Sequence, residues 1–259
     1  AAQALSETAL IPAEPITVVL SRKGWIRAAK GTEVNPRELS YRAEDGYLHS
    51  GTGRPNQPLL CIDSTGRVYG LRSHELPSPR GMGEPVGKQL KTPAGASFCG
   101  VMIGDNDSRY LLASDAGSGF VATFEELLTR NKSGKAVLSA RGAGVLSPQR
   151  VFDYEDDWVC AITDSGRLLI FPLAELPLLS RGKGVKLVNI PASRYKSGEE
   201  KLAGIAVFRE GDSLQLYAGK QHMRLKPSDV ENFIGARAQR GRALPRGYKR
   251  PTAIEVLRE

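Results

Sequence analysis

A pattern that recurs about every 50 residues constrains this chain more than any other feature. Each copy has an apolar run, a Ser, Asp or Thr, a turn that contains glycine, and a second apolar run. The turn glycines are Gly24, Gly66, Gly117, Gly166 and Gly219, which are 42, 51, 49 and 53 residues apart. A repeat of this length predicts an array or a propeller-like ring, because one unit cannot bury both of its faces alone.

Each copy predicts a β-hairpin. The apolar runs are rich in Val, Ile, Leu, Phe and Tyr, and Asp, Ser and Gly between them suit a tight turn. The hairpins are expected at residues 18–28, 59–71, 111–124 and 159–171, with a weaker copy at 214–225. The 28 glycines and 16 prolines among 259 residues also favour many short strands over long helices.

A second signature follows each hairpin. It is a Leu, often a Pro, then a basic glycine-rich turn and another apolar run, at 75–90, 126–138, 175–190 and 228–244. A short helical turn is expected where the Leu lies. A hairpin plus two further strands gives a four-stranded blade, so the chain is predicted to be all-β with five such blades. We expect the final run, 252–257, to complete a blade near the start of the chain and so protect open strand edges.

The charge indicates a polyanionic partner. Lys and Arg number 36 against 28 Asp and Glu, which gives a net charge of +8 and an isoelectric point near 9.5. Nucleic acid and an anionic membrane surface both fit this balance. The cations gather in the glycine-rich turns, and residues 219–250 alone carry nine cations and two acids. If these turns occupy equivalent places on successive blades, they form a positive rim whose glycines let the backbone approach a phosphate.

Other chemistry is weakly represented. Cys61, Cys99 and Cys160 are widely spaced and lie in apolar runs, so we interpret them as thiols packed in a reducing compartment. The acidic run 153–157 lacks the spacing of a calcium loop and is expected to be a solvated turn. Asp63, Asp115 and Asp164 recur in the hairpin turns, where capping explains them better than catalysis. The large aromatic residues fall in strand runs, so duplex DNA is a better ligand than a single strand.

Several stretches resemble one protein family over nearly the whole chain. They are ITVVLSRKGWIRAAKG (16–31), NQPLLCIDSTGRVYGL (56–71), LPSPRGMGEP (76–85), LLASDAGSGFVATFEELLTRNKSGKA (111–136) and LPLLSRGKGVKLVNIP (176–191). The chain is similar to the C-terminal domains of the DNA gyrase and topoisomerase IV A subunits, and more so to those of topoisomerase IV. The resemblance implies a five-bladed β-pinwheel, whose blades exchange strands, as one domain over 14–258. Residues 1–13 would be a linker from an N-terminal breakage–reunion region.

The resemblance also implies a function. Members bind and bend duplex DNA along a basic outer rim and present it for decatenation and supercoil relaxation. ATP and Mg²⁺ act in other domains, so no cofactor, metal or catalytic residue is expected in this chain. The expected partners are double-stranded DNA, the N-terminal part of the same polypeptide, two ATPase B subunits and a second A subunit. The expected location is the cytoplasm, with the nucleoid, and a peripheral association of the whole enzyme with the inner membrane stays open.

Fifteen cations are the candidate phosphate contacts. They are Arg22, Lys23, Arg27, Lys30, Arg80, Arg130, Lys132, Lys135, Arg181, Lys183, Lys186, Arg237, Arg240, Arg242 and Arg246. The basic heptad of gyrase, Gln-Arg-Arg-Gly-Gly-Lys-Gly, is absent, and its nearest remnant is 180–184. The first repeat instead has a net charge of −2 over 33–45, so we expect partial rather than full wrapping of DNA. The alternative function is a propeller-like scaffold that binds proteins and not nucleic acid.

Overall fold

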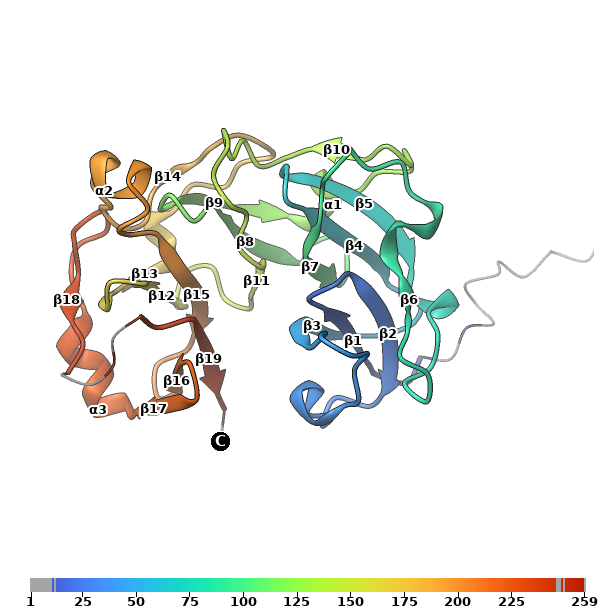
Figure 1. The fold of residues 1–259 in the computed structure, drawn as a ribbon, viewed down its shortest axis with the longest axis horizontal. Coiled ribbons are helices and arrows are strands. Elements are labelled where there is room, and N and C mark those ends of the chain that lie inside the picture. The colour runs from blue at the N-terminus through green and yellow to red at the C-terminus, as the bar shows by residue number, and fades with distance from the viewer. Residues whose placement is uncertain (1–10, 12, 246–247, 249, 259) are drawn as a thin grey trace, which may run out of the picture. The chain divides into compact units, whose positions relative to one another are not determined.

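The structure, a computed structural model, describes all residues except 1–10, 12, 246, 247, 249 and 259. Five antiparallel sheets follow one another along the chain (Figure 1). The helices between them have three to five residues: η2 (Pro36–Glu38), η3 (Ser73–Glu75), η4 (Val86–Gln89), α1 (Phe124–Leu127), η5 (Leu173–Glu175), α2 (Ala192–Lys196), α3 (Pro227–Val230) and η6 (Glu231–Phe233). The helical turns expected after the hairpins are therefore present.

Four of the sheets have four strands. In spatial order the first is β3 (Tyr47–Gly53), β1 (Ile16–Ser21), β2 (Trp25–Lys30) and β6 (Glu84–Pro85). The second is β10 (Lys135–Ala136), β5 (Arg67–Arg72), β4 (Pro58–Asp63) and β7 (Phe98–Ile103). The third is β11 (Gln149–Val151), β8 (Arg109–Ala113), β9 (Ser118–Thr123) and β14 (Val185–Lys186). The fourth is β15 (Leu202–Phe208), β12 (Trp158–Thr163), β13 (Arg167–Pro172) and β18 (Arg242–Ala243).

The two-residue strand of each of these four sheets comes from the next repeat. Strand β6 lies after the hairpin β4–β5 in the sequence, yet it pairs with β2 of the first sheet. Strands β10, β14 and β18 likewise follow the next hairpin and pair with β5, β9 and β13. Successive repeats therefore exchange a strand, so none of these four sheets is built from one repeat alone.

The end of the chain corrects one expectation. Among the described residues the fifth sheet has three strands, β17 (Gln221–Leu225), β16 (Ser213–Ala218) and β19 (Ala253–Leu257). Strand β19 pairs with β16. The prediction that 252–257 completes a blade near the start of the chain is therefore wrong. The reason is that β19 takes the place that β3, β7, β11 and β15 hold, beside the first strand of the preceding hairpin.

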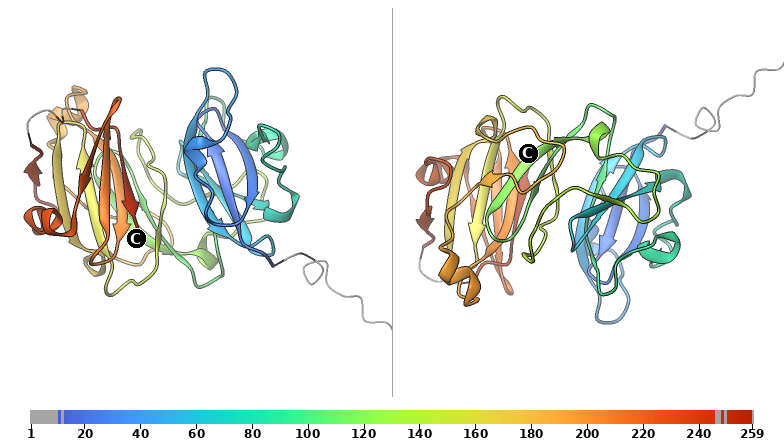
Figure 2. Two further views of the ribbon diagram at one scale, coloured as in Figure 1. Left: turned by 90° about the horizontal axis from the view of Figure 1, so that it is seen from below. Right: turned by 90° about the horizontal axis from the view of Figure 1, so that it is seen from above.

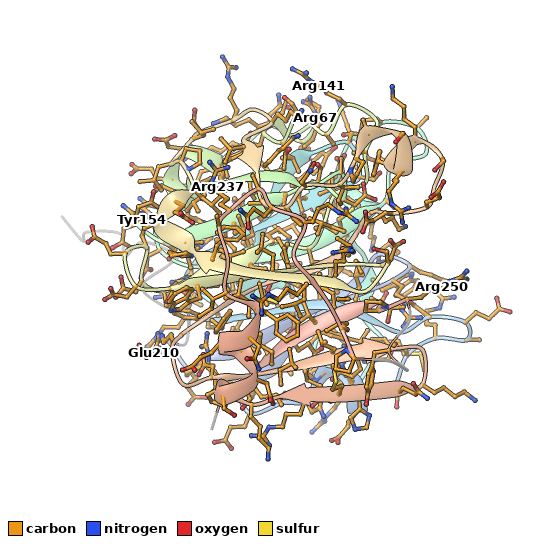
Figure 3. All side chains as sticks on the ribbon, turned by 90° about the vertical axis from the view of Figure 1, so that its left-hand side faces the viewer. Arg67, Arg141, Tyr154, Glu210, Arg237 and Arg250 are labelled. Carbon is orange, nitrogen blue, oxygen red and sulfur yellow. The ribbon has the colours of Figure 1, made fainter. Side chains whose placement is uncertain are left out.

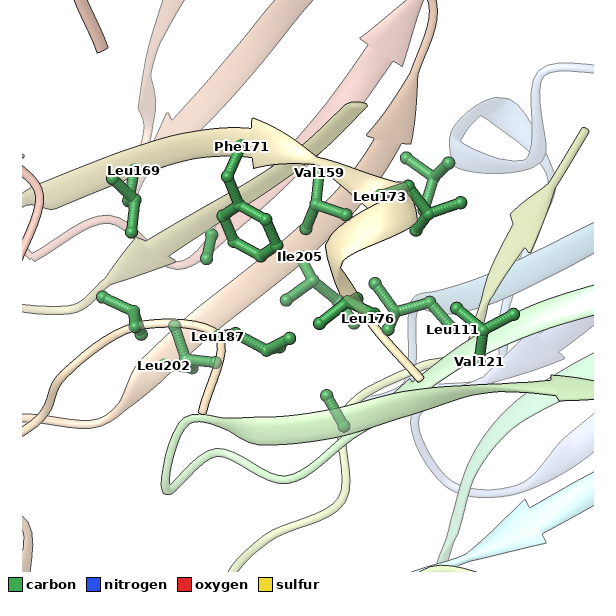
Figure 4. Packing of buried hydrophobic residues seen from close by; sticks show 14 of the residues in the cluster. Leu111, Val121, Val159, Leu169, Phe171, Leu173, Leu176, Leu187, Leu202 and Ile205 are labelled. Atoms are coloured by element: carbon green, nitrogen blue, oxygen red, sulfur yellow. The ribbon is translucent and has the colours of Figure 1, made fainter. Parts of the chain in front are cut away.

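The chain divides into two compact units, which are described separately. The first unit contains 1–108 and 124–137, and the second contains 109–123 and 138–259. In the first unit, one core packs the first two sheets around Leu20, Leu59 and Val101. In the second, Val121, Phe171 and Ile205 join the third and fourth sheets (Figure 4). Ile162 and Leu216 join the fourth and fifth, and Figure 2 shows the sheets of this unit side by side. A single domain over 14–258 stays a prediction, and most of the proposed linker 1–13 lies outside the described residues.

The hairpin turns have the expected chemistry at Asp63. One carboxylate oxygen of Asp63 accepts the N–H groups of Thr65 and Arg67, and the other accepts the hydroxyl of Tyr69 at 2.7 Å. Asp115 and Asp164 act differently, because they accept N–H groups of Gly144 and Lys201 from distant loops. These two aspartates tie neighbouring segments together.

Two other expectations are corrected or confirmed here. Asp157, at the end of the acidic run, is buried and accepts the N–H groups of Phe152 and Asp153, so it is not part of a solvated turn. Cys61 and Cys160 are buried as expected, whereas Cys99 is half-buried. Burial raises the pKa of the Cys99 thiol to about 12, which keeps it protonated at neutral pH.

Candidate nucleic-acid interface

Four basic turns occupy equivalent positions on their sheets. We call them the edge turns: residues 79–83, 130–134, 180–184 and 237–241. Each leads directly into a two-residue edge strand. The first residue of that strand pairs with the second residue of the neighbouring hairpin strand: Glu84 with Ile26, Lys135 with Val68, Val185 with Gly119, and Arg242 with Leu168. The charge pattern of the sequence therefore repeats in the structure, sheet by sheet.

The last glycine of every edge turn is required by the sheet beneath it. Gly83, Gly134, Gly184 and Gly241 all have left-handed backbone, with φ between 76° and 87°. A Cβ at these positions would lie within 2.7 Å of the carbonyl oxygens of Ile26, Val68, Gly119 and Leu168, respectively. Only glycine fits such an approach. These glycines dock the turn on its own sheet, and the approach of a phosphate to the turns stays a prediction.

Arginines on the hairpins hold the edge turns in place. Arg67 donates from Nε to the carbonyl of Ser133 at 3.0 Å and from its terminal nitrogen to Gly134 at 2.9 Å. Arg167 donates to the carbonyl of Gly241 at 3.1 Å. Sequence reasoning missed these residues. Their signal is the dipeptide Gly-Arg, which occurs in two hairpin turns at 66–67 and 166–167.

The residues that follow an edge strand form backbone hydrogen bonds with the next edge turn along the chain in the same unit. In the first unit the N–H of Lys91, beyond β6, donates to the carbonyl of Lys132 at 2.8 Å. In the second unit Ser139 donates to Gly182 and Asn189 donates to Gln239, both at 2.9 Å. The cations of each unit therefore lie along one connected stretch of backbone. This stretch also contains three cations that the sequence analysis did not select: Lys88, Lys91 and Arg141. Figure 3 labels Arg141 and Arg237.

Most of the predicted contacts are exposed. Nine of them are exposed and have no side-chain hydrogen bond or ion pair among the described residues: Arg22, Lys30, Arg80, Arg130, Lys132, Arg181, Lys183, Lys186 and Arg242. In the first unit, Lys88, Arg130 and Lys132 line a groove of about 1380 Å³. A ligand can contact these side chains without breaking an interaction that holds the fold.

Three predicted contacts are already engaged with their own unit. Lys23 donates to the carbonyl of Ala43 at 3.5 Å. Lys135 donates to the carbonyl of Glu126 at 2.5 Å, and Arg237 donates to the carbonyl of Lys186 at 2.7 Å. Arg246 lies outside the described residues.

Arg27 has a structural role and is not accessible to a phosphate. Arg27 is only 3% exposed, and its guanidinium donates to the carbonyls of Ser40 at 2.6 Å and Gly81 at 3.0 Å. It also lies over the ring of Tyr41, 4.8 Å from the centroid. Arg27 is a buried member of a β-strand, and its selection as a phosphate contact is corrected.

Arg240 is likewise corrected. It donates to Asn189 at 2.8 Å and to both carboxylate oxygens of Glu200, at 2.5 and 3.2 Å. The Glu200 side chain is completely buried and also accepts the hydroxyls of Thr163 and Ser165. Burial alone would raise the pKa of Glu200, but these donors lower it to about 2. The pair therefore fastens the fourth edge turn to the interior of the second unit.

The described residues offer little else for chemistry. They contain no group of three or more His, Cys, Asp or Glu side chains arranged to hold a metal ion. Among the same residues, no helix has the length and apolar character needed to cross a membrane. The exposed cations are thus the main chemical feature of the described surface.

Comparisons with known proteins agree with this geometry. The family model for the DNA gyrase C-terminal domain, a β-propeller, matches residues 157–209. The A subunit of DNA topoisomerase 4 from Pseudomonas aeruginosa is 49% identical over 98% of this chain, and that from Escherichia coli is 40% identical over 98%. The solved structure of the E. coli ParC C-terminal domain is 40% identical, with a TM-score of 0.75, and the match covers 94% of this chain and 98% of that one. The chain belongs to the family of C-terminal domains of topoisomerase IV A subunits.

Membership in this family confirms the all-β, five-bladed fold predicted from the repeat. A gyrase A C-terminal domain structure, 14% identical with a TM-score of 0.68, shares the fold; it is matched over 95% of this chain and 84% of its own. The chain spans about a third of the length of the curated relatives, since it covers 34% of both named proteins. These relatives are bacterial.

Proposed function

We propose that this topoisomerase IV domain binds and bends duplex DNA through the edge turns and presents it to the rest of the enzyme. One observation carries the proposal: the same basic turn recurs at the same sheet position four times, and the cations of the first three turns are exposed. Phosphates attract such cations without regard to base sequence. A bent duplex gains contacts as it follows successive turns, which offsets a bending cost of about 1–6 kcal/mol for 20–30 base pairs.

The whole enzyme supplies the remaining functions in this proposal. Decatenation and supercoil relaxation, with ATP and Mg²⁺, belong to other parts of the same polypeptide and to its partners, two ATPase B subunits and a second A subunit. The domain itself has no catalytic role and acts in the cytoplasm on nucleoid DNA. Its contribution is to choose the duplex geometry that reaches the enzyme.

The salt dependence of binding tests the proposal. If about 6–10 phosphates are neutralised, log K for a labelled 30-base-pair duplex should fall with log[salt] at about −0.9 per phosphate. Replacing Arg181, Lys183 and Lys186 by alanine should make that slope shallower by about 3. Fluorescence anisotropy between 50 and 200 mM salt measures both values.

A matched variant separates the edge turns from net charge. Lys196, Lys201 and Lys220 are exposed cations of the same unit that lie outside the edge turns. Replacing these three by alanine removes the same charge, but it should change the slope by less than 1. Equal slopes for the two variants would contradict the edge-turn interface, and salt-independent binding would contradict phosphate contact altogether.

A further inference from the structure

An exposed aromatic ring in the second unit is surrounded by three arginines. Phe152, directly after β11, is 47% exposed. The guanidinium carbons of Arg258, Arg209 and Arg150 lie 4.4, 5.1 and 5.4 Å from the centroid of its ring. We call these four residues the Phe152 cluster. It brings together an apolar surface and three positive charges that the proposed DNA interface does not use.

The cluster lies away from the edge turns. Arg150 belongs to β11, Arg209 follows β15 and Arg258 follows β19. Strands β11 and β15 are the outermost strands of the third and fourth sheets on the side opposite β14 and β18, which carry the edge turns. A duplex that follows the edge turns of this unit therefore contacts the other margin of these sheets.

Arg209 and Arg258 are exposed. Within the described part of the chain, no carboxylate pairs with the guanidinium of Arg209 or Arg258. The face of an aromatic ring attracts each cation by only about 0.5–1 kcal/mol at an exposed site, and like charges repel one another. A carboxylate that entered the cluster could accept paired N–H groups from the planar guanidinium forks.

The surroundings favour a protein segment over a nucleic acid strand. Asp153 and Glu210 directly follow Phe152 and Arg209 in the chain, and Glu155 and Asp156 come soon after; all four are exposed, and Glu210 is labelled in Figure 3. A nucleic acid strand carries a charge at every nucleotide, so it would bring more negative charge toward these acids than a short peptide would. A short peptide can place one or two carboxylates among the arginines and an apolar side chain on Phe152. Arginine and aromatic residues are also the types enriched at the centres of protein interfaces.

We propose that the Phe152 cluster is the docking site for an acidic protein segment that carries an apolar residue beside its carboxylates. The proposal is independent of DNA binding at the edge turns. The partner is defined by this chemistry: carboxylates for Arg209 and Arg258, and an apolar side chain for the ring of Phe152.

A labelled peptide tests the docking site on the intact chain. The probe is a fluorescein-labelled twelve-residue peptide in which glutamates flank one leucine and one phenylalanine, and its control has glutamines in place of the glutamates. Anisotropy at 150 mM salt should show saturable binding of the acidic peptide only. Arg209→Ala with Arg258→Ala should weaken binding about tenfold or more, because two charge-assisted contacts are lost. Both side chains are exposed, so this variant should keep its circular dichroism spectrum and melting temperature.

Further variants make the test specific. Arg209→Lys with Arg258→Lys keeps the charge but loses the planar guanidinium groups, so this variant should bind the peptide with intermediate affinity. Phe152→Ala should weaken peptide binding several-fold. The edge-turn variant with Arg181, Lys183 and Lys186 replaced by alanine should bind the peptide within about twofold of the unaltered chain. The double alanine variant should bind duplex DNA within about twofold as well.

Three outcomes would overturn the docking site. One is no saturable peptide binding by the unaltered chain at 1 mM peptide. A second is an equal loss of peptide binding in the cluster and edge-turn variants. The third is a single-stranded oligonucleotide that displaces the peptide and loses affinity in the double alanine variant, which would assign the cluster to nucleic acid. Absence of duplex binding by the unaltered chain would contradict only the proposed DNA function.

Discussion

Replacing Glu200 by glutamine should remove a buried anchor of the fourth edge turn. The Glu200 side chain has no exposed surface and accepts two hydrogen bonds from Arg240, together with the hydroxyls of Thr163 and Ser165. Breaking one partner of a buried ion pair costs about 3–5 kcal/mol, because the other charge stays buried without compensation. Arg240 is partly exposed and can reach water, so we expect the lower end, about 3 kcal/mol.

The pH dependence of this loss follows from the pKa of Glu200. The pKa is lowered from 4.5 to about 2 in the folded state, so the stabilisation is present above pH 4.5. It is lost as the pH falls toward 2, where the folded protein also takes up the proton. The difference in unfolding free energy between the unaltered chain and Glu200→Gln should therefore be full at pH 7 and shrink steadily below pH 4.5.

Urea unfolding, monitored by circular dichroism, measures this difference at a series of pH values. Glu199→Gln is the matched control, because Glu199 is an exposed neighbour whose ion pair with Arg194, at 3.0 Å, should contribute about 0–1 kcal/mol. If Glu200→Gln costs no more than Glu199→Gln at pH 7, the reasoning about the buried pair is refuted. A loss that stays constant down to pH 2.5 would refute the assignment of the pH dependence to this carboxylate.

Three further predictions concern the sheets and the DNA. Gly83→Ala should destabilise the first unit by more than about 1–2 kcal/mol, since its Cβ would meet the carbonyl of Ile26 in left-handed backbone, whereas Gly81→Ala in the same turn has open space and should be nearly neutral by thermal unfolding. Tyr69→Phe should cost about 1–3 kcal/mol in urea unfolding, because it leaves a buried oxygen of Asp63 without its 2.7 Å donor; an unchanged midpoint would contradict this. Ligation of circular plasmid with the domain should leave the linking number almost unchanged while energy transfer on short duplexes reports bending, and a large shift in linking number would contradict partial wrapping.

The hairpins could be predicted from the sequence because their information is local. A glycine such as Gly66 with φ of 85° needs only its own turn, and the apolar runs on both sides identify the paired strands. Strand exchange was implied only by the family resemblance, and the residues that take part could not be predicted, because β6 and β14 have two residues each and pair with residues about 60 to 70 positions earlier. The final run was misplaced for the same reason, since its partner β16 is separated from it by two strands and two short helices.

The candidate interface was predictable only in part. Recurrence identified the exposed cations Arg130, Arg181 and Lys183, because a charge repeated at one position of several repeats is visible in the sequence. The same reasoning could not separate Arg240 from them. Its partner Glu200 is 40 residues away, and nothing in the local sequence shows that this carboxylate is buried.

In the edge turns, the residues that provide the positive charge are different from those that fix the backbone. The backbone of each turn is fixed by a glycine against a carbonyl oxygen, and in the last three turns a carbonyl also accepts an N–H group of a neighbouring segment. None of these interactions uses the exposed side chains of Arg80, Arg181 or Lys183, so these positions can hold cations without a cost in packing. It follows that two classes of substitution should behave oppositely. Removing the cations should make the slope of log K for DNA against log[salt] shallower without changing the free energy of unfolding. Gly184→Ala should instead lower the free energy of unfolding, and the protein that stays folded should bind DNA with the original slope.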